Sequence, residues 1–155
     1  MDDVLRALAI SVSRATELES FLREKGVVAA YLFGSRATGE NQEESDLDLA
    51  LLLSSEDSYS AYYELYSSLA DFFYPLELDL VILNQTPLDL AFEIIANGRL
   101  IFCFSEDACT DYEDRLIRDY LDFSVELELY YQEVKEEMRQ RAAKELGTSE
   151  PKTGR

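Results

Sequence analysis

Residues 27–53 read VVAAYLFGSRATGENQEESDLDLALLL and form the most informative stretch of the chain. Its first seven residues are apolar, β-branched at the start and aromatic at the end, and they stop at Gly34, which predicts a buried strand. Its last nine residues predict a second strand, in which the period of two places Asp46 and Asp48 on one face and leucines on the other. The stretch therefore predicts two strands joined by a polar connection, with two carboxylates pointing the same way.

The segments on either side alternate between helical and extended patterns. Apolar residues at three- and four-residue spacing predict one amphipathic helix over residues 2–25, closed by Gly26. The same spacing predicts further helices, and extended apolar runs predict further strands: helices over residues 59–73, 88–97 and 106–146, and strands over residues 76–83 and 99–104. The tyrosines of the helix at residues 59–73 are predicted to pack it against a sheet.

The composition limits the class of protein. A chain of 155 residues, 47% hydrophobic and 30% charged, is typical of one globular domain. The 14 basic and 32 acidic residues give a net charge of −18, which disfavours nucleic acid and anionic lipid and favours a basic protein partner or cations. The acidic amino terminus and the lack of a long apolar run predict a cytoplasmic protein without contact to a membrane.

The residues that are missing or scarce narrow the chemistry further. The chain contains no histidine, which excludes a catalytic triad with an imidazole base and a histidine-ligated zinc. Cys103 and Cys109 are too few for a disulfide framework or a four-ligand zinc site, and we expect both to be reduced thiols. Acid–base and metal chemistry must therefore depend on carboxylates.

The turn and the paired aspartates suit phosphate chemistry together. Gly34 and Ser35 follow a strand and precede a short helix, where backbone N–H groups and a hydroxyl can converge on a phosphate. Asp46 and Asp48 lie about 6 to 7 Å apart on one strand face, and their repulsion is unfavourable unless a cation offsets it. Magnesium would offset it and would bridge a triphosphate, so the combination predicts nucleotidyl transfer.

Two further residues are candidates for this site. Asp79 would face the same way as Asp46 and Asp48 if its strand pairs with theirs, and would then be the third carboxylate of the site. Glu77 lies on the same face and is the competing candidate for that place. Alternatively, Asp79 is only an exposed residue at a sheet edge. The guanidinium of Arg36 could reach a triphosphate from beside Ser35, and a solvated arginine at a helix start is an equally good interpretation.

A Gly-Ser pair, ten intervening residues and Asp-x-Asp resemble the signature of the DNA polymerase β-like nucleotidyltransferase superfamily, and residues 32–53 are similar to its minimal nucleotidyltransferases, the MNT or MntA-like antitoxins. The resemblance covers residues 27–83. It implies an α/β (α+β) fold with a small mixed sheet packed by helices. Residues 1–105 would be the core and 106–146 a C-terminal helical extension of the same domain. Apart from the resemblance, the sequence of residues 147–155 predicts a disordered tail.

The resemblance also implies roles for the residues of the motif. Gly34 and Ser35 would grip the nucleotide phosphates; Arg36 is a further nucleotide candidate from its place beside Ser35 and not from the resemblance. Asp46 and Asp48 would bind two Mg²⁺ ions, and Asp79 would complete the metal site and help to deprotonate the attacking hydroxyl. These six residues are the expected catalytic, metal and nucleotide site.

The same family pairs with HEPN-domain toxins, which implies that AMP passes from ATP to a tyrosine hydroxyl of a HEPN ribonuclease toxin and silences it. This chain is too short to carry the larger second domain of aminoglycoside nucleotidyltransferases, and its acidity fits a basic partner in a hetero-oligomer. Two alternatives stay open: an antitoxin that acts by binding without catalysis, and a free-standing nucleotidyltransferase that modifies a small-molecule alcohol.

Overall fold

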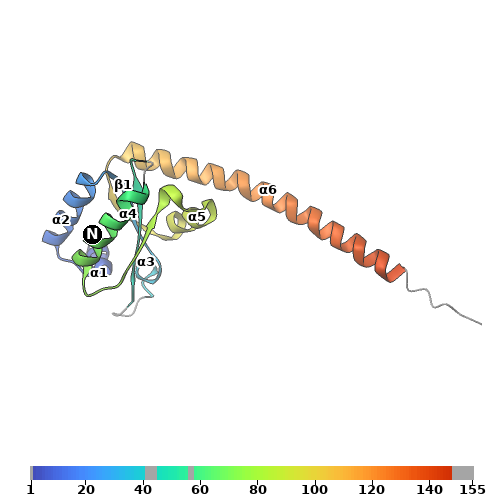
Figure 1. Ribbon diagram of the computed structural model, residues 1–155, viewed down its shortest axis with the longest axis horizontal. Coiled ribbons are helices and arrows are strands. Elements are labelled where there is room, and N and C mark those ends of the chain that lie inside the picture. Colours follow the sequence, from blue (N-terminus) through green and yellow to red (C-terminus); the bar gives the residue numbers. More distant parts are fainter. Residues whose placement is uncertain (1, 41–44, 56–57, 148–155) are drawn as a thin grey trace, which may run out of the picture. The chain divides into compact units, whose positions relative to one another are not determined.

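The computed structural model describes residues 2–40, 45–55 and 58–147 (Figure 1). Within these residues the strands form one four-stranded sheet in the order β3-β2-β1-β4. Its strands are β1 (Val27–Phe33), β2 (Leu47–Leu53), β3 (Leu78–Ile82) and β4 (Arg99–Cys103). β1 pairs antiparallel with both β2 and β4, whereas β2 pairs parallel with β3, so the mixed sheet expected from the family resemblance is confirmed.

The described residues also form six α-helices and one 3-10 turn. They are α1 (Asp2–Leu8), α2 (Val12–Glu24), α3 (Ser35–Thr38), α4 (Ser58–Phe73), α5 (Leu88–Asn97) and α6 (Glu106–Gly147), with a 3-10 turn, η1 (Leu83–Gln85), after β3. The helix predicted over residues 88–97 is confirmed, and the one predicted over residues 106–146 runs as the single helix α6. Apart from Gly147, the expected disordered tail lies outside the described residues.

Apolar side chains cover both faces of the sheet, as the period of two in β2 predicts. Leu47, Leu49, Leu51 and Leu53 pack on one face with leucines of α2 and α4. On the other face Ala50 and Leu52 pack with side chains from α5 and from the first turns of α6. Each fully buried leucine stabilises the fold by about 1.5–3 kcal/mol. Because Asp48 shares the parity of Ala50 and Leu52, its carboxylate belongs to the face that α5 covers.

The single helix predicted over residues 2–25 is wrong, because the chain breaks it between α1 and α2. Ala9 adopts a φ of 55°, and the N–H groups of Ala9 and Ile10 donate to the carbonyls of Arg6 and Leu5, each at 3.0 Å. These two bonds form the left-handed termination that commonly ends a helix. The Ser11 hydroxyl then accepts from the Arg14 N–H at 3.4 Å and caps α2.

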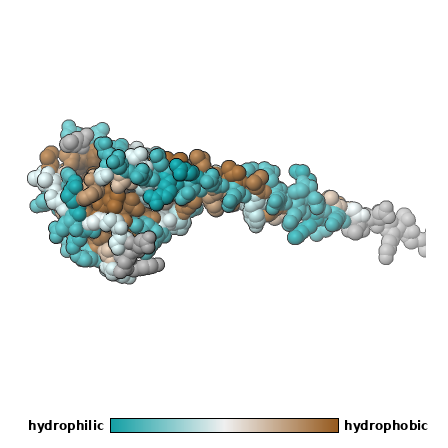
Figure 2. All heavy atoms as spheres, turned by 90° about the horizontal axis from the view of Figure 1, so that it is seen from above, coloured by the Kyte–Doolittle hydropathy of each residue, from teal (hydrophilic) through white to brown (hydrophobic). Residues whose placement is uncertain are grey.

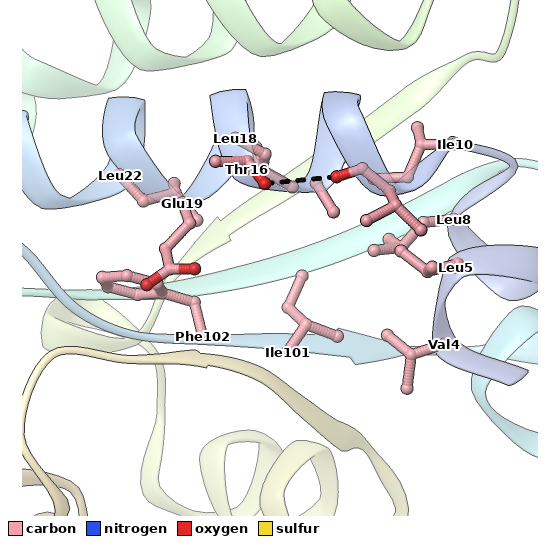
Figure 3. A pocket seen from close by; sticks show the side chains of 12 residues that line it. Val4, Leu5, Leu8, Ile10, Thr16, Leu18, Glu19, Leu22, Ile101 and Phe102 are labelled. Carbon is pink, nitrogen blue, oxygen red and sulfur yellow. Dashed lines mark hydrogen bonds between the residues drawn. The ribbon is translucent and has the colours of Figure 1, made fainter. Parts of the chain in front are cut away.

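The sequence does not reveal this break, because α1 and α2 both direct apolar residues toward the same cavity next to β4. Together with β4 they enclose a cavity of about 350 Å³. Figure 3 shows Leu5 and Leu8 of α1 and Leu18 of α2 around this cavity, near Ile101 and Phe102 of β4. The apolar spacing therefore continues across the turn, and periodicity alone reads it as one helix.

Cys103 and Cys109 form a disulfide, so the expectation of reduced thiols is wrong. Cys103 ends β4 and Cys109 lies in the first turn of α6, and the short connection brings their Cα atoms to 6.3 Å. That separation lies within the range that a disulfide spans.

The chain divides into two compact units, one up to Ile117 and one from Arg118 onward. The first contains the sheet, α1 to α5 and the beginning of α6. Here the Tyr31 hydroxyl donates to a carboxylate oxygen of Glu113 at 2.7 Å, which ties α6 to β1. Among the described helices, none is both long and apolar enough to span a bilayer.

Replacing Ala9 with glycine is expected to raise the free energy of unfolding by up to about 1 kcal/mol, because glycine adopts a positive φ without the steric cost that alanine bears. The same substitution inside a helix, Ala61→Gly in α4, is expected to lower it by about 1 kcal/mol. Urea denaturation of both variants measures this difference in sign. A loss of stability in Ala9→Gly would contradict the left-handed turn.

Candidate active site

A glycine turn ends β1 and begins the site. Gly34 has a φ of 68° and a ψ of −158°, a backbone conformation that is almost confined to glycine. Its carbonyl accepts from the Ala37 N–H at 3.1 Å as α3 begins. A Cβ placed on Gly34 would overlap the Asp48 carboxylate and lie 2.9 Å from its Cγ. Both the backbone angles and the neighbouring carboxylate therefore require glycine at this position.

The sheet register brings the aspartates to this turn. Phe33, the last residue of β1, is the register partner of Asp48 in β2, and Asp48 is also the register partner of Asp79 in β3. Residues paired in this way on neighbouring strands point to the same face of the sheet. Asp46 lies just before β2 and shares the parity of Asp48. The condition under which Asp79 was predicted to join the aspartates, pairing of the two strands, is met.

Glu77, the competing candidate, occupies a different place. It precedes β3, and its backbone carbonyl accepts from the Leu47 N–H at 2.8 Å. The ladder between β2 and β3 begins one residue later, so it is Asp79 that lies opposite Asp48.

The carboxylates interact electrostatically. Partial burial raises the pKa of Asp48, and the negative charges of Asp79 and Asp46 raise it further, while Arg36 acts in the opposite direction. Asp46 and Asp79 are exposed and Asp48 is half-buried. The ionised form of Asp48 is therefore unfavourable in the folded chain, and a bound cation would offset that penalty.

The donor set fits magnesium in kind, since carboxylate oxygens are the ligands that this hard cation prefers. The raised pKa of Asp48 shows that the charges of Asp46 and Asp79 gather here and that Arg36 offsets them only in part. As the side chains are placed, however, no three carboxylates or cysteines of the described residues converge on a common metal position.

Arg36 is buried, with 3% of its surface exposed, so it is not the solvated arginine that one interpretation expected. Its Nε donates to the Ser45 carbonyl at 2.8 Å and its Nη1 to the Ala7 carbonyl at 3.1 Å. The guanidinium thus joins α1, α3 and the residue that precedes Asp46. It holds the segment that leads into the aspartate strand while it lowers the pKa of Asp48.

Two cavities share the side chain of Leu90 in α5. One, of about 460 Å³, is lined by Gly34, Ser35 and residues of α5. The other, of about 410 Å³, is lined by Tyr62 and Tyr63 of α4 and by residues after β3. Burial is the main cause that raises the pKa of Tyr62, and the negative charge of Asp79 raises it further. The wall of the second cavity that Tyr62 forms is therefore near the carboxylates.

The sequence analysis identified Gly34 and Ser35 but not Tyr62, Tyr63 or Leu90 as residues near the site. Tyr62 packs partly against the core as predicted, but Tyr63 is 78% exposed, so the packing interpretation is wrong for that side chain. Nothing in the spacing of this helix separates a packed tyrosine from one that lines a cavity. Leu90 likewise has the spacing of an ordinary apolar residue of an amphipathic helix.

A mixed sheet with a glycine turn set against paired aspartates defines the class of nucleotidyltransferases. The family model described as "Polymerase beta, Nucleotidyltransferase" matches residues 16–107, which is more than half of the chain. The chain therefore belongs to the polymerase β-type nucleotidyltransferase family, and the resemblance seen in the sequence is confirmed.

Solved structures have the same fold. A structure described as "the toxin-antitoxin with AMP-PNP" matches with a TM-score of 0.64 at 24% identity, over 78% of this chain and 98% of that one. Another contains a tri-AMPylated Shewanella oneidensis HEPN toxin in complex with MNT antitoxin; it matches with a TM-score of 0.60 at 21% identity, over 79% of this chain and 96% of that one. No curated protein matches the chain. At these identities the solved structures establish the fold alone.

Gly34→Ala is expected to lower the free energy of unfolding by about 1–3 kcal/mol, because the new methyl group meets the Asp48 carboxylate in a backbone conformation that only glycine adopts readily. Gly39→Ala is the control. Gly39 also has a positive φ, of 79°, but a Cβ there would have no neighbour within 4 Å. Chemical denaturation should give the larger loss for Gly34→Ala, and equal losses would contradict the close approach to Asp48.

Asp48→Asn is expected to raise the melting temperature of the metal-free protein at neutral pH. The pKa of Asp48 is raised in the folded chain, so the ionised carboxylate costs stability once the pH exceeds its value in the unfolded chain. The gain should shrink as the pH falls below the folded-state pKa and disappear below the pKa of the unfolded chain, where the wild-type carboxyl is protonated in both states.

Thermal melts with a chelator measure this effect at neutral and acid pH. Asp71→Asn, which neutralises an exposed carboxylate of α4, controls for the overall reduction of negative charge. A lower melting temperature for Asp48→Asn at neutral pH would refute the prediction.

Proposed function

We propose that this protein transfers AMP from ATP to a tyrosine hydroxyl of a HEPN-domain toxin and thereby neutralises it. The observation that carries the proposal is the position of Asp48, which lies against the Gly34 turn on one side and opposite Asp79 on the other. A phosphate-binding turn and a carboxylate pair are the parts that nucleotidyl transfer requires.

We assign the donor side of the reaction to the turn and the aspartates. The Ser35 hydroxyl and the backbone at Gly34 would hold the phosphates of ATP. Asp46, Asp48 and Asp79 would hold two Mg²⁺ ions, which would neutralise charge on the phosphates. Arg36 would support this side by holding the Ser45 carbonyl next to Asp46.

The acceptor oxygen would form a bond to the α-phosphorus of ATP. The bond from that phosphorus to the oxygen that bridges to the β-phosphate would break, and pyrophosphate would leave. The Asp79 carboxylate is the group that we assign to receive the hydroxyl proton, because it is exposed while Asp48 is half-buried. The product is a phosphodiester between AMP and the acceptor.

Charge and structural similarity support a protein as the acceptor. The net charge of −18 favours association with a basic protein, such as a ribonuclease toxin. Solved neighbours include complexes described as a toxin–antitoxin with AMP-PNP and as a tri-AMPylated HEPN toxin with MNT antitoxin. An AMPylating antitoxin accounts for the fold, the site and the charge together.

Asp48→Asn and Asp79→Asn are each expected to reduce AMP transfer by roughly 100-fold or more, because each removes a charge that the transition state requires. The assay incubates the full chain with labelled ATP, Mg²⁺ and a purified HEPN-domain toxin. Asp71→Asn should transfer AMP at the wild-type rate.

The outcomes separate the alternatives. Absence of labelling by the wild-type chain would refute the proposed activity. If Asp48→Asn is inactive but still protects cells from the toxin at native expression, the chain neutralises its partner by binding. ATP turnover with small alcohols and not with the protein would identify a small-molecule transferase.

A further inference from the structure

An apolar stripe runs along the part of α6 that lies beyond Ile117. At about 100° per residue, six large side chains fall on one face roughly 120° wide: Phe123, Leu127, Tyr130, Tyr131, Val134 and Met138. Exposed fractions along it reach 59% for Tyr130 and 65% for Met138. Figure 2 shows brown, apolar atoms among the teal ones along this helix. These six residues are called the apolar stripe below.

Among the described residues of its own unit, nothing covers the apolar stripe. From Arg118 onward, the described residues of that unit form a single helix. A lone helix gains little stability in water, and large exposed apolar patches mark interaction sites. The stripe therefore calls for a partner surface.

Charge along one edge of the stripe indicates which partner it fits. Asp119, Glu126 and Glu133 follow one another at seven-residue intervals, so they form an acidic row beside the apolar face. On the opposite edge, the positions at the same seven-residue intervals are Ser124, Tyr131 and Met138. None of these three side chains is basic.

A second copy of this chain fits poorly. In an antiparallel pair of helices the acidic rows would face one another and repel, and in a parallel pair each row would face uncharged side chains. A groove with an apolar floor and a border of lysines or arginines matches both the stripe and its acidic edge.

We propose that the apolar stripe of α6 docks into an apolar, basic-bordered groove of the HEPN-domain toxin. This inference rests on the proposed function and adds the surface by which the acceptor protein is held. The helix from Arg118 to Gly147 is about 45 Å long, which is enough for a groove that spans a small domain. Docking there would supply a binding surface for the acceptor protein.

A matched pair of substitutions tests the docking surface. Leu127 lies in the centre of the stripe, whereas Leu129, two residues further on, lies on the opposite side of the helix and is 61% exposed. Leu127→Glu is expected to weaken binding to the toxin at least about tenfold, because it places a charge in the apolar contact. Leu129→Glu should bind like the wild type.

Calorimetric titration of the full-length variants with the purified toxin measures these affinities. Circular dichroism checks that both variants keep their helix, and binding of AMP-PNP checks the nucleotide site. Glu126→Lys combined with Glu133→Lys should also weaken binding and reduce its dependence on salt, because the acidic row then no longer attracts the basic border.

The results distinguish this inference from the function on which it rests. If the wild type transfers AMP to the toxin and Leu127→Glu binds as tightly as Leu129→Glu, the docking surface is refuted and the function stands. If the wild type neither binds nor labels the toxin, the proposed function fails and the inference fails with it. A chain that is dimeric by light scattering, and monomeric only as Leu127→Glu, would identify the stripe as a self-contact instead.

Discussion

The close approach of a backbone to a carboxylate, at Gly34 and Asp48, is the constraint on which the site depends. The Asp48 carboxylate fills the space in which a side chain at position 34 would begin, and the glycine adopts a φ of 68° to make the turn. Two ladders converge on the same residue, since Asp48 is paired with Phe33 across the antiparallel edge and with Asp79 across the parallel edge. The pairing of β1, β2 and β3 thereby holds the turn and the acidic strands together.

This arrangement lowers stability locally, and the rest of the fold compensates. Asp48 is partly buried near two other carboxylates, which raises its pKa and makes its charge unfavourable. Around it, the leucines of β2 and the apolar residues of α2, α4 and α5 form two hydrophobic clusters, one on each face of the sheet. Arg36 contributes a buried positive charge whose donors also hold the carbonyls of Ala7 and Ser45. Such local conflicts with stability are typical of functional sites, where the binding of a ligand relieves them.

The proposals for this chain divide the reaction between its two units. The unit up to Ile117 contains the glycine turn and the carboxylates, which serve the nucleotide in the proposed function. The unit from Arg118 onward offers an apolar stripe with an acidic edge, which suits a protein partner rather than a nucleotide. A transferase that modifies a macromolecule has no need of a second domain to enclose its acceptor, because the acceptor provides its own surface. The acidity of the chain and the exposed stripe are consistent with such an acceptor.

Residue patterns alone predicted the strands that carry the motif, the shared face of Asp46 and Asp48, and the family, because strand alternation and glycine turns are local properties. The break at Ala9 could not be predicted in this way, since the apolar spacing continues across the turn. The disulfide could not be predicted either, because the approach of Cys103 and Cys109 depends on the path of the chain between β4 and α6. Three further features became known from the folded chain. Asp79 lies opposite Asp48, Arg36 is buried and donates to two carbonyls, and Tyr63 lines a cavity instead of packing in the core. These facts follow from the pairing of strands and the packing of helices that are distant in the chain, and no local pattern of residues encodes them.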